Sequence, residues 1–167
     1  DASREIHTAD YTQRTMFSGW DVYRSEFPLL TVISPETVND EVNSLLEIAK
    51  QKNSSFPRWE LMGIDAGCMV GDPGLIVVAD AYIKGIRNYD ADTAYEIAKA
   101  SSLCKTELFG KEFHTIRPVC EQYTKDAYVP DKLSDTLEYL LADYTMSNFA
   151  EAKGENADAE YFMGRVK

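Results

Sequence analysis

Basic residues and long apolar runs are both scarce in this chain. Its 167 residues contain 17 Lys and Arg against 28 Asp and Glu, which gives a formal net charge of -11. A field of this sign repels polyanions, so nucleic acid and anionic membrane surfaces are not expected as partners. No apolar stretch is long enough to span a bilayer, and the first residues lack the basic and apolar regions of a signal peptide.

Patterns for zinc binding and for a disulfide framework are absent as well. The two histidines, His7 and His114, lie at no ligand spacing to another His or Cys, so a zinc site is not expected. Cys68, Cys104 and Cys120 form no CxxC pair. A bridge between Cys104 and Cys120 stays open, but the pattern favours unpaired buried thiols. Calcium also stays open, because it needs only carboxylate and carbonyl oxygens, which are plentiful.

What the chain does contain is typical of one helical globular domain. With 44% hydrophobic and 27% charged residues it can bury a core of its own. Apolar residues recur at helical spacing and predict helices over 15–33, 34–52, 73–86, 91–103, 133–153 and 158–165. We expect Pro28 to kink or divide the first of these, and 105–131 to be a long loop with short helices. Since no strand is convincing, we predict an all-α fold of antiparallel helical hairpins.

The last predicted helix acquires an apolar face, formed by Tyr161, Phe162 and Val166, just where the chain stops. A helix must bury such a stripe against another element. We therefore expect residues 1–167 to be a single helical domain that is an excerpt of something larger.

The segment from Trp59 to Pro73 is the strongest candidate for a site. It combines aromatic, acidic, glycine and cysteine residues in one apparent loop, although a plain turn between helices fits about equally well. Asp65 and Asp72 flank Cys68 in this loop, and two such acids could act as a general acid and base pair. We favour Asp72 as the cap of the next helix, which leaves Asp65 as the better chemical candidate.

A second cluster lies near the start of the chain. Helical spacing places Trp20, Tyr23 and Arg24 on one face and allows Asp21 to pair with Arg24. Sugars suit such a cluster, because their C–H faces lie on aromatic rings while carboxylates accept hydroxyl hydrogen bonds. Taken alone, core aromatics with one surface ion pair are the better interpretation, although the adjacent Trp59–Glu60 repeats the pairing of ring and acid.

Other acidic positions have simpler interpretations. Asp80 and Lys84 stand four residues apart on a helix, a spacing that predicts a surface ion pair. Glu138 and Asp143 lie in a long helix whose opposite side is apolar, so we expect both to be solvated.

Several longer motifs occur in a fixed order along the chain. They are Phe17–Arg24 (FSGWDVYR), Phe27–Thr31 (FPLLT), Pro57–Leu61 (PRWEL), Gly67–Pro73 (GCMVGDP), Val78–Ile86 (VADAYIKGI) and Leu133–Tyr139 (LSDTLEY). Together they resemble glycoside hydrolase family 92, the exo-acting α-mannosidases of bacteria. The resemblance implies part of an (α/α)6 toroid, preceded in the whole enzyme by a β-sandwich domain. It also implies calcium-dependent hydrolysis of α-linked mannose with inversion, and a secreted, periplasmic or cell-surface enzyme whose signal sequence is not in this chain.

The resemblance also implies residue roles. Asp65 occupies the general-acid position, within Gly63–Met69, where typical members have Glu in Gly-x-Glu-x-x-x-Met. Residues expected to shape the sugar pocket are Trp20, Asp21, Arg24, Trp59, Glu60 and Cys68. The base and most calcium ligands would lie beyond Lys167, so this chain alone should be inactive.

The exchange of Glu for Asp leaves alternatives open. Aspartate is one methylene shorter, a loss of roughly 1.5 Å in reach, and misplacement on that scale can cost about a hundredfold in rate. A relative that cleaves mannosyl-phosphate linkages would need no acid, because phosphate departs without protonation. A weakened relative, or a non-catalytic helical domain that binds carbohydrate or another protein, are the other interpretations.

Overall fold

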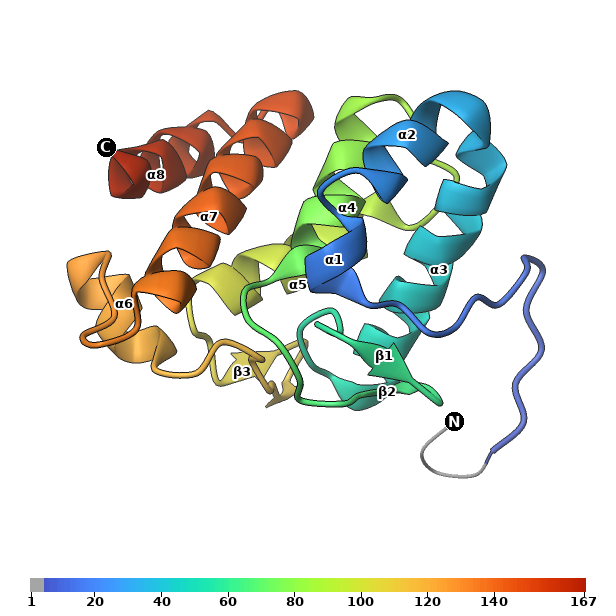
Figure 1. Ribbon diagram of the computed structural model, residues 1–167, viewed down its shortest axis with the longest axis horizontal. Coiled ribbons are helices and arrows are strands. Elements are labelled where there is room, and N and C mark those ends of the chain that lie inside the picture. The colour runs from blue at the N-terminus through green and yellow to red at the C-terminus, as the bar shows by residue number, and fades with distance from the viewer. Residues whose placement is uncertain (1–4) are drawn as a thin grey trace.

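The computed structural model describes residues 5–167, and most of that part of the chain is helical (Figure 1). Its helices are α1 (Gly19–Val22), α2 (Glu26–Ile33), α3 (Pro35–Lys52), α4 (Pro73–Ile83), α5 (Ala91–Ser102), α6 (Cys120–Asp126), α7 (Leu133–Lys153) and α8 (Asn156–Val166). The longest helix, α7, packs most extensively against α8, to which a short link joins it, and against α4. The predicted all-α fold of helical hairpins is confirmed.

Most helix boundaries follow from residues that begin or end helices. Pro35 starts α3, and Asn53 ends it in the left-handed conformation at φ 46°. Gly154 ends α7 in the same way at φ 81°. The first predicted helix is indeed divided, but the break lies at 23–25, ahead of Pro28. Pro28 sits in the first turn of α2, where its missing N–H removes no helical hydrogen bond.

Two short hairpins correct the prediction of a chain without strands. β1 (Glu60–Leu61) pairs with β2 (Ile64–Asp65), and β3 (Glu107–Leu108) pairs with β4 (Lys111–Glu112), both antiparallel. Each turns through two residues with positive φ, Met62–Gly63 and Phe109–Gly110. That is the geometry of a tight two-residue hairpin. Strands this short carry no alternating pattern, so the sequence could not reveal them.

Helix α4 is the centre of the core and lies between α3 and α7 (Figure 1). Leu75 and Val78 are fully buried, as the apolar sequence predicts. Gly74 comes so near Phe56 that an added Cβ would lie 2.5 Å from the Phe56 Cβ. Although α4 is almost entirely apolar apart from Asp80, no helix within residues 5–167 is long and apolar enough to cross a membrane.

The cysteines differ from the expectation of unpaired thiols. Cys104 and Cys120 form a disulfide with their Cα atoms 5.7 Å apart, and Cys68 is free. The bond joins the end of α5 to the start of α6 and closes the intervening segment. Sequence spacing could not decide this pairing, because the two residues meet only through the path of the folded chain.

Arg117, which is fully buried within the segment that the disulfide closes, connects the N-cap of α4 to α7. The Arg117 Nε donates to Asp72 Oδ2 at 2.9 Å, and its Nη1 donates to Asp143 Oδ1 at 3.1 Å. Arg165 from α8 lies 2.7 Å from Asp143 Oδ2, which also accepts from the Tyr123 hydroxyl. Asp143 is therefore a buried ion partner, and the prediction of a solvated position was wrong.

Asp72 is a partial correction of the same kind. It occupies the N-cap position of α4 as predicted, but its side chain makes no cap hydrogen bond. The carboxylate instead accepts from Arg117 and from the Ser101 hydroxyl, at 2.9 Å in each case. Both partners are distant in the sequence, so no local pattern could have identified them.

Replacing Arg117 with methionine should cost about 3–5 kcal/mol of unfolding free energy, because Asp72 and Asp143 would then be buried charges without this partner. Denaturant unfolding followed by circular dichroism measures the loss. Lys84→Met is the matched control, since Lys84 pairs with Asp80 at 2.7 Å on the surface. Such exposed pairs contribute about 0–1 kcal/mol. Equal losses in the two variants would contradict a stabilising role for the buried pairs.

Glu41 on α3 is a buried acid of another kind, with 8% of its surface exposed. Burial raises the pKa of Glu41 to about 7; Glu60 and Glu26 add to the increase, and Arg14 opposes it. Its ordinary pKa is 4.5, so between these values the folded protein binds more protons than the unfolded chain. The stability that this group contributes is complete below pH 4.5 and is lost as the pH rises through about 7.

Glu41→Gln should therefore flatten the decline in stability between about pH 5 and pH 8, because glutamine cannot ionise. Above pH 7 the variant should exceed the wild type by on the order of 1–3 kcal/mol. Thermal unfolding measured across this pH range tests it. Glu36→Gln, at an exposed acid of the same helix, should leave the slope as it is. Parallel curves for the wild type and Glu41→Gln would refute the assignment.

Candidate functional site

The predicted site loop folds as the β1–β2 hairpin followed by a run of turns into α4. Asp65, at the end of β2, is half-buried, and its Oδ1 accepts the backbone N–H groups of Arg58 and Trp59 at 2.9 and 3.0 Å. Its Oδ2 accepts the N–H of Gly67 at 3.1 Å. Both oxygens thus fasten the loop to itself and fix the position of this carboxylate.

Glu60, the other acid of the hairpin, is 2% exposed. Its carboxylate accepts from the Thr15 hydroxyl at 2.9 Å and from the backbone N–H groups of Met16 and Gly63 at 2.5 and 2.6 Å. The observed contacts of Glu60 tie the segment before α1 to the hairpin turn. Contact with substrate stays a prediction for this residue.

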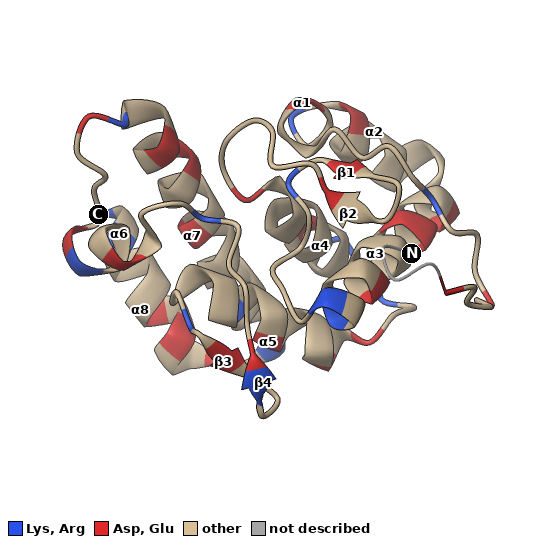
Figure 2. Cartoon of the chain, turned by 90° about the horizontal axis from the view of Figure 1, so that it is seen from below, with Lys and Arg blue, Asp and Glu red and all other residues tan. Residues whose placement is uncertain are grey.

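The backbone segments that carry the two predicted clusters, one around Trp20 and one around Trp59, lie side by side. Ser18 and Trp59 form an antiparallel bridge. Beside it the Glu60 N–H donates to the Phe17 carbonyl at 2.8 Å, and the Gly19 N–H donates to the Arg58 carbonyl at 3.1 Å. Figure 2 shows the strands β1 and β2, each with an acidic residue, close to α1. The fold therefore brings the start of α1 and the site loop together, as a shared pocket requires.

The ion pair predicted in α1 is wrong in its acidic partner. Arg24 Nη2 lies 2.5 Å from Glu138 Oε1 on α7, whereas Asp21 accepts from the Ser18 hydroxyl at 2.6 Å. Asp21 is an exposed residue. Glu138 is correspondingly not solvated, because 13% of its side chain is exposed.

Glu138 also binds both aromatic residues of α1 and its C-terminal turn. It accepts from Trp20 Nε1 at 3.2 Å and from the Tyr23 hydroxyl at 2.9 Å. Burial and the hydrogen bond to Glu138 raise the pKa of Tyr23 to about 12, so Tyr23 stays a neutral donor. Sequence reasoning assigned Glu138 no role, although this residue lies inside the LSDTLEY motif, which was the available signal.

The aromatic face expected to stack against a sugar is already in use. The Arg24 guanidinium carbon lies 5.2 Å from the Trp20 ring centroid and 4.6 Å from that of Tyr23. Arg24 therefore covers these ring faces. The partly exposed guanidinium group of Arg24, and not the ring faces, is the part that faces the solvent.

The end of the loop meets the same glutamate. An added Cβ on Gly71, whose φ is +85°, would lie 3.0 Å from the Glu138 Cβ and 3.1 Å from its Oε2. Cys68, earlier in the loop, is a free, half-buried thiol within 3.7 Å of the Ala66 carbonyl. The loop thus passes α7 at Glu138 before Asp72 anchors it to Arg117.

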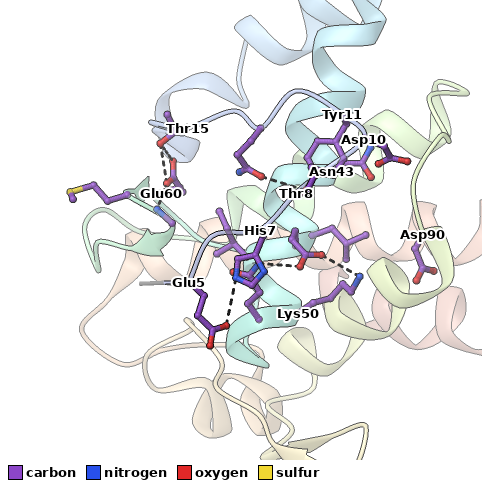
Figure 3. A pocket seen from close by; sticks show the side chains of 18 residues that line it. Glu5, His7, Thr8, Asp10, Tyr11, Thr15, Asn43, Lys50, Glu60 and Asp90 are labelled. Atoms are coloured by element: carbon purple, nitrogen blue, oxygen red, sulfur yellow. Dashed lines mark hydrogen bonds and ion pairs between the residues drawn. The ribbon is translucent and has the colours of Figure 1, made fainter. Parts of the chain in front are cut away.

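A hollow of about 990 Å³ lies beside the turn of the β1–β2 hairpin (Figure 3). The N-terminal segment, α3 and the hairpin turn line it, with Tyr11, Lys50 and Glu60 among the side chains. Glu60 is the predicted pocket residue that lines this hollow, whereas Trp20, Trp59 and Asp65 do not line it.

The family model and the solved structures that match this chain point to the same enzyme family. Residues 1–167 match the model of the glycosyl hydrolase family 92 catalytic domain. The solved GH92 alpha-mannosidase BT3965 of Bacteroides thetaiotaomicron is 30% identical, with a TM-score of 0.84 over 98% of this chain and 22% of its own. Its complex with mannoimidazole gives 30% identity and a TM-score of 0.83, covering 98% of this chain and 21% of that one.

The GH92 inverting mannosidase BT2199 of Bacteroides thetaiotaomicron VPI-5482 is 28% identical, with a TM-score of 0.78 over 89% of this chain and 20% of its own. No curated protein sequence matches the chain. The chain spans about a fifth of the length of the solved structures it resembles. The match over the whole chain and the shared fold show that this chain belongs to glycosyl hydrolase family 92, a family of glycoside-cleaving enzymes.

Proposed function

We propose that this chain is part of a calcium-dependent, inverting exo-α-mannosidase that removes α-linked mannose from glycans. The observation that carries the proposal is the similarity, over 98% of the chain, to an alpha-mannosidase whose structure was also solved with mannoimidazole. The neighbour described as an inverting mannosidase supports the stereochemical outcome. Measuring turnover of α-mannosides by the full-length enzyme that contains this chain, and the anomer first released, tests it.

Inversion needs two groups on opposite sides of the sugar. One carboxylic acid protonates the departing oxygen, and a second carboxylate activates the attacking water. In this proposal Trp20, Arg24 and Trp59 line the sugar pocket and Asp65 stands at the acid position. Asp21, Glu60 and Cys68 belong to the same proposed pocket. The activating carboxylate comes from outside residues 1–167.

The contacts of Asp65 favour a second candidate function. A general acid must hold a proton and give it away, whereas both oxygens of Asp65 accept backbone N–H groups of its own loop. That arrangement suits a fixed acceptor better than a proton donor. A mannosyl-phosphate linkage needs no such donor, because phosphate leaves without protonation. Cleavage of mannosyl-phosphate is therefore the second candidate.

The calcium ion is proposed to bind through residues outside this chain. Within residues 5–167, no three His, Cys, Asp or Glu side chains are grouped as a metal site requires. The acids of the loop are also committed, Asp65 to backbone N–H groups and Glu60 to the hairpin turn. These residues therefore do not fit a calcium site by themselves.

The remainder of the catalytic domain is the proposed partner of an exposed stripe on α7. Leu133, Leu137, Leu141 and Tyr144 follow helical spacing along one face and are 66%, 57%, 38% and 46% exposed. Further helices of an (α/α)6 toroid, with a β-sandwich domain upstream, would bury such a face. The disulfide between Cys104 and Cys120 supports a secreted, periplasmic or cell-surface location, since structural disulfides persist in oxidising compartments.

Asp65→Asn in the full-length enzyme distinguishes the two candidates. If Asp65 is the general acid, turnover of α-mannobiose should fall by about 10²–10⁴-fold. Turnover of 4-nitrophenyl α-mannoside, which has a good leaving group, should fall far less. If Asp65 is only an acceptor, both substrates should lose activity equally and a mannosyl-phosphate diester should be the best substrate of the wild type. Binding of α-mannobiose with no turnover of any of these substrates would indicate a non-catalytic carbohydrate-binding domain.

A further inference from the structure

Glu138 gathers three hydrogen-bond donors from one short stretch of chain. Trp20 and Arg24 donate to its Oε1 and the Tyr23 hydroxyl donates to its Oε2, all within 3.2 Å. A carboxylate offers about four acceptor sites, so these donors nearly fill it. Because 13% of its side chain is exposed, water competes little for the remaining capacity.

Helix α1 needs such an anchor. It contains four residues and receives no side-chain cap hydrogen bond from Ser18. A helix of this length does not hold its shape alone, because a single turn is too short to offset the cost of nucleation. Glu138 grips the edge of the Arg24 guanidinium while the Trp20 and Tyr23 rings support its face. The orientation of these side chains is therefore set from α7.

The same glutamate limits the path of the site loop. An added Cβ on Gly71 would lie 3.0 Å from the Glu138 Cβ, a contact so tight that Glu138 would have to move by a few tenths of an ångström, and the φ of +85° also favours glycine. Arg117 then holds Asp72, the next residue, by an ion pair at 2.9 Å. The C-terminal end of the loop that carries Trp59 and Asp65 thus lies against α7.

We propose that Glu138 is a positioning residue for sugar recognition, because its carboxylate orients Arg24 and Trp20 and receives the end of the site loop at Gly71. Glu138 acts through Arg24 and Trp20 and does not itself contact the reacting atoms. This inference rests on the proposed function, since it assigns Arg24 and Trp20 to the pocket of a mannosidase. Loss of the negative charge would free Arg24 to leave the ring faces and would weaken substrate binding.

Steady-state kinetics of Glu138→Gln in the full-length enzyme, with 4-nitrophenyl α-mannoside as substrate, tests the proposal. KM should rise by about tenfold or more while kcat changes by less than about threefold, because the lost interaction serves binding. Arg24→Met should raise KM to a similar degree. The double variant should be no worse than either single variant, because residues that act as one unit are not additive. Asp92→Asn, which loses an exposed partner of Lys153, is the matched control.

A purely structural role predicts a different pattern. Glu138→Gln would then lower the melting temperature and the active fraction while leaving KM unchanged, and that result overturns the proposal. Additive effects in the double variant also overturn it. Should Glu138→Gln fail to fold, Glu138→Asp replaces it, with the same expected increase in KM.

Failure of the proposed function gives a separate signature. A wild-type enzyme that turns over no mannoside contradicts the mannosidase assignment. The variants are then compared by calorimetric titration with α-mannobiose. A Kd that weakens by about tenfold in both single variants and no further in the double variant supports the positioning role of Glu138. An unchanged Kd, or no binding at all, refutes it.

Discussion

The buried ion pairs of Arg117 are the constraint on which the rest of this structure depends. Two charged carboxylates, Asp72 and Asp143, lie in the interior where solvation is lost, and Arg117 supplies their compensating charge. Asp72 ends the site loop at the N-cap position of α4, while Asp143 lies in α7. The arginine therefore connects the central helix of the core, the longest helix and the loop. The disulfide between Cys104 and Cys120 closes the segment that carries Arg117.

The geometry of the candidate site depends on this arrangement and on a further charged residue, Glu138. Because α4 and α7 are held in place, Glu138 on α7 faces the short helix α1. It accepts hydrogen bonds from Trp20 and Tyr23 and forms an ion pair with Arg24. Trp20 and Arg24, two of the predicted pocket residues, are thereby placed by α7, and the bridge between Ser18 and Trp59 joins α1 to the loop that carries the others. A short helix and an irregular loop acquire defined geometry because rigid helices hold them on both sides.

The acids of the chain divide into distinct tasks that a formal charge of -11 conceals. Asp72, Asp143 and Glu138 compensate arginines. Asp65 and Glu60 accept backbone N–H groups and shape turns. Burial raises the pKa of Glu41 to about 7. This division bears on catalysis, because an acid occupied by backbone N–H groups is a poor proton donor. For this reason a substrate whose leaving group departs without protonation is one of the two proposed substrates.

The sequence by itself determined the helices, because their signals are local: apolar periodicity, Pro35 at a helix start, and Gly154 at a helix end. It also determined the family through ordered motifs. Only the tertiary structure decided the partners of Arg24 and Asp72, the pairing of Cys104 with Cys120, and the burial of Asp143. Those contacts join residues far apart in the chain, and local spacing carries no information about which distant helix will face them. Periodicity predicted the near neighbour Asp21 for Arg24, whereas the fold supplied Glu138 because burial makes a shielded carboxylate the stronger partner.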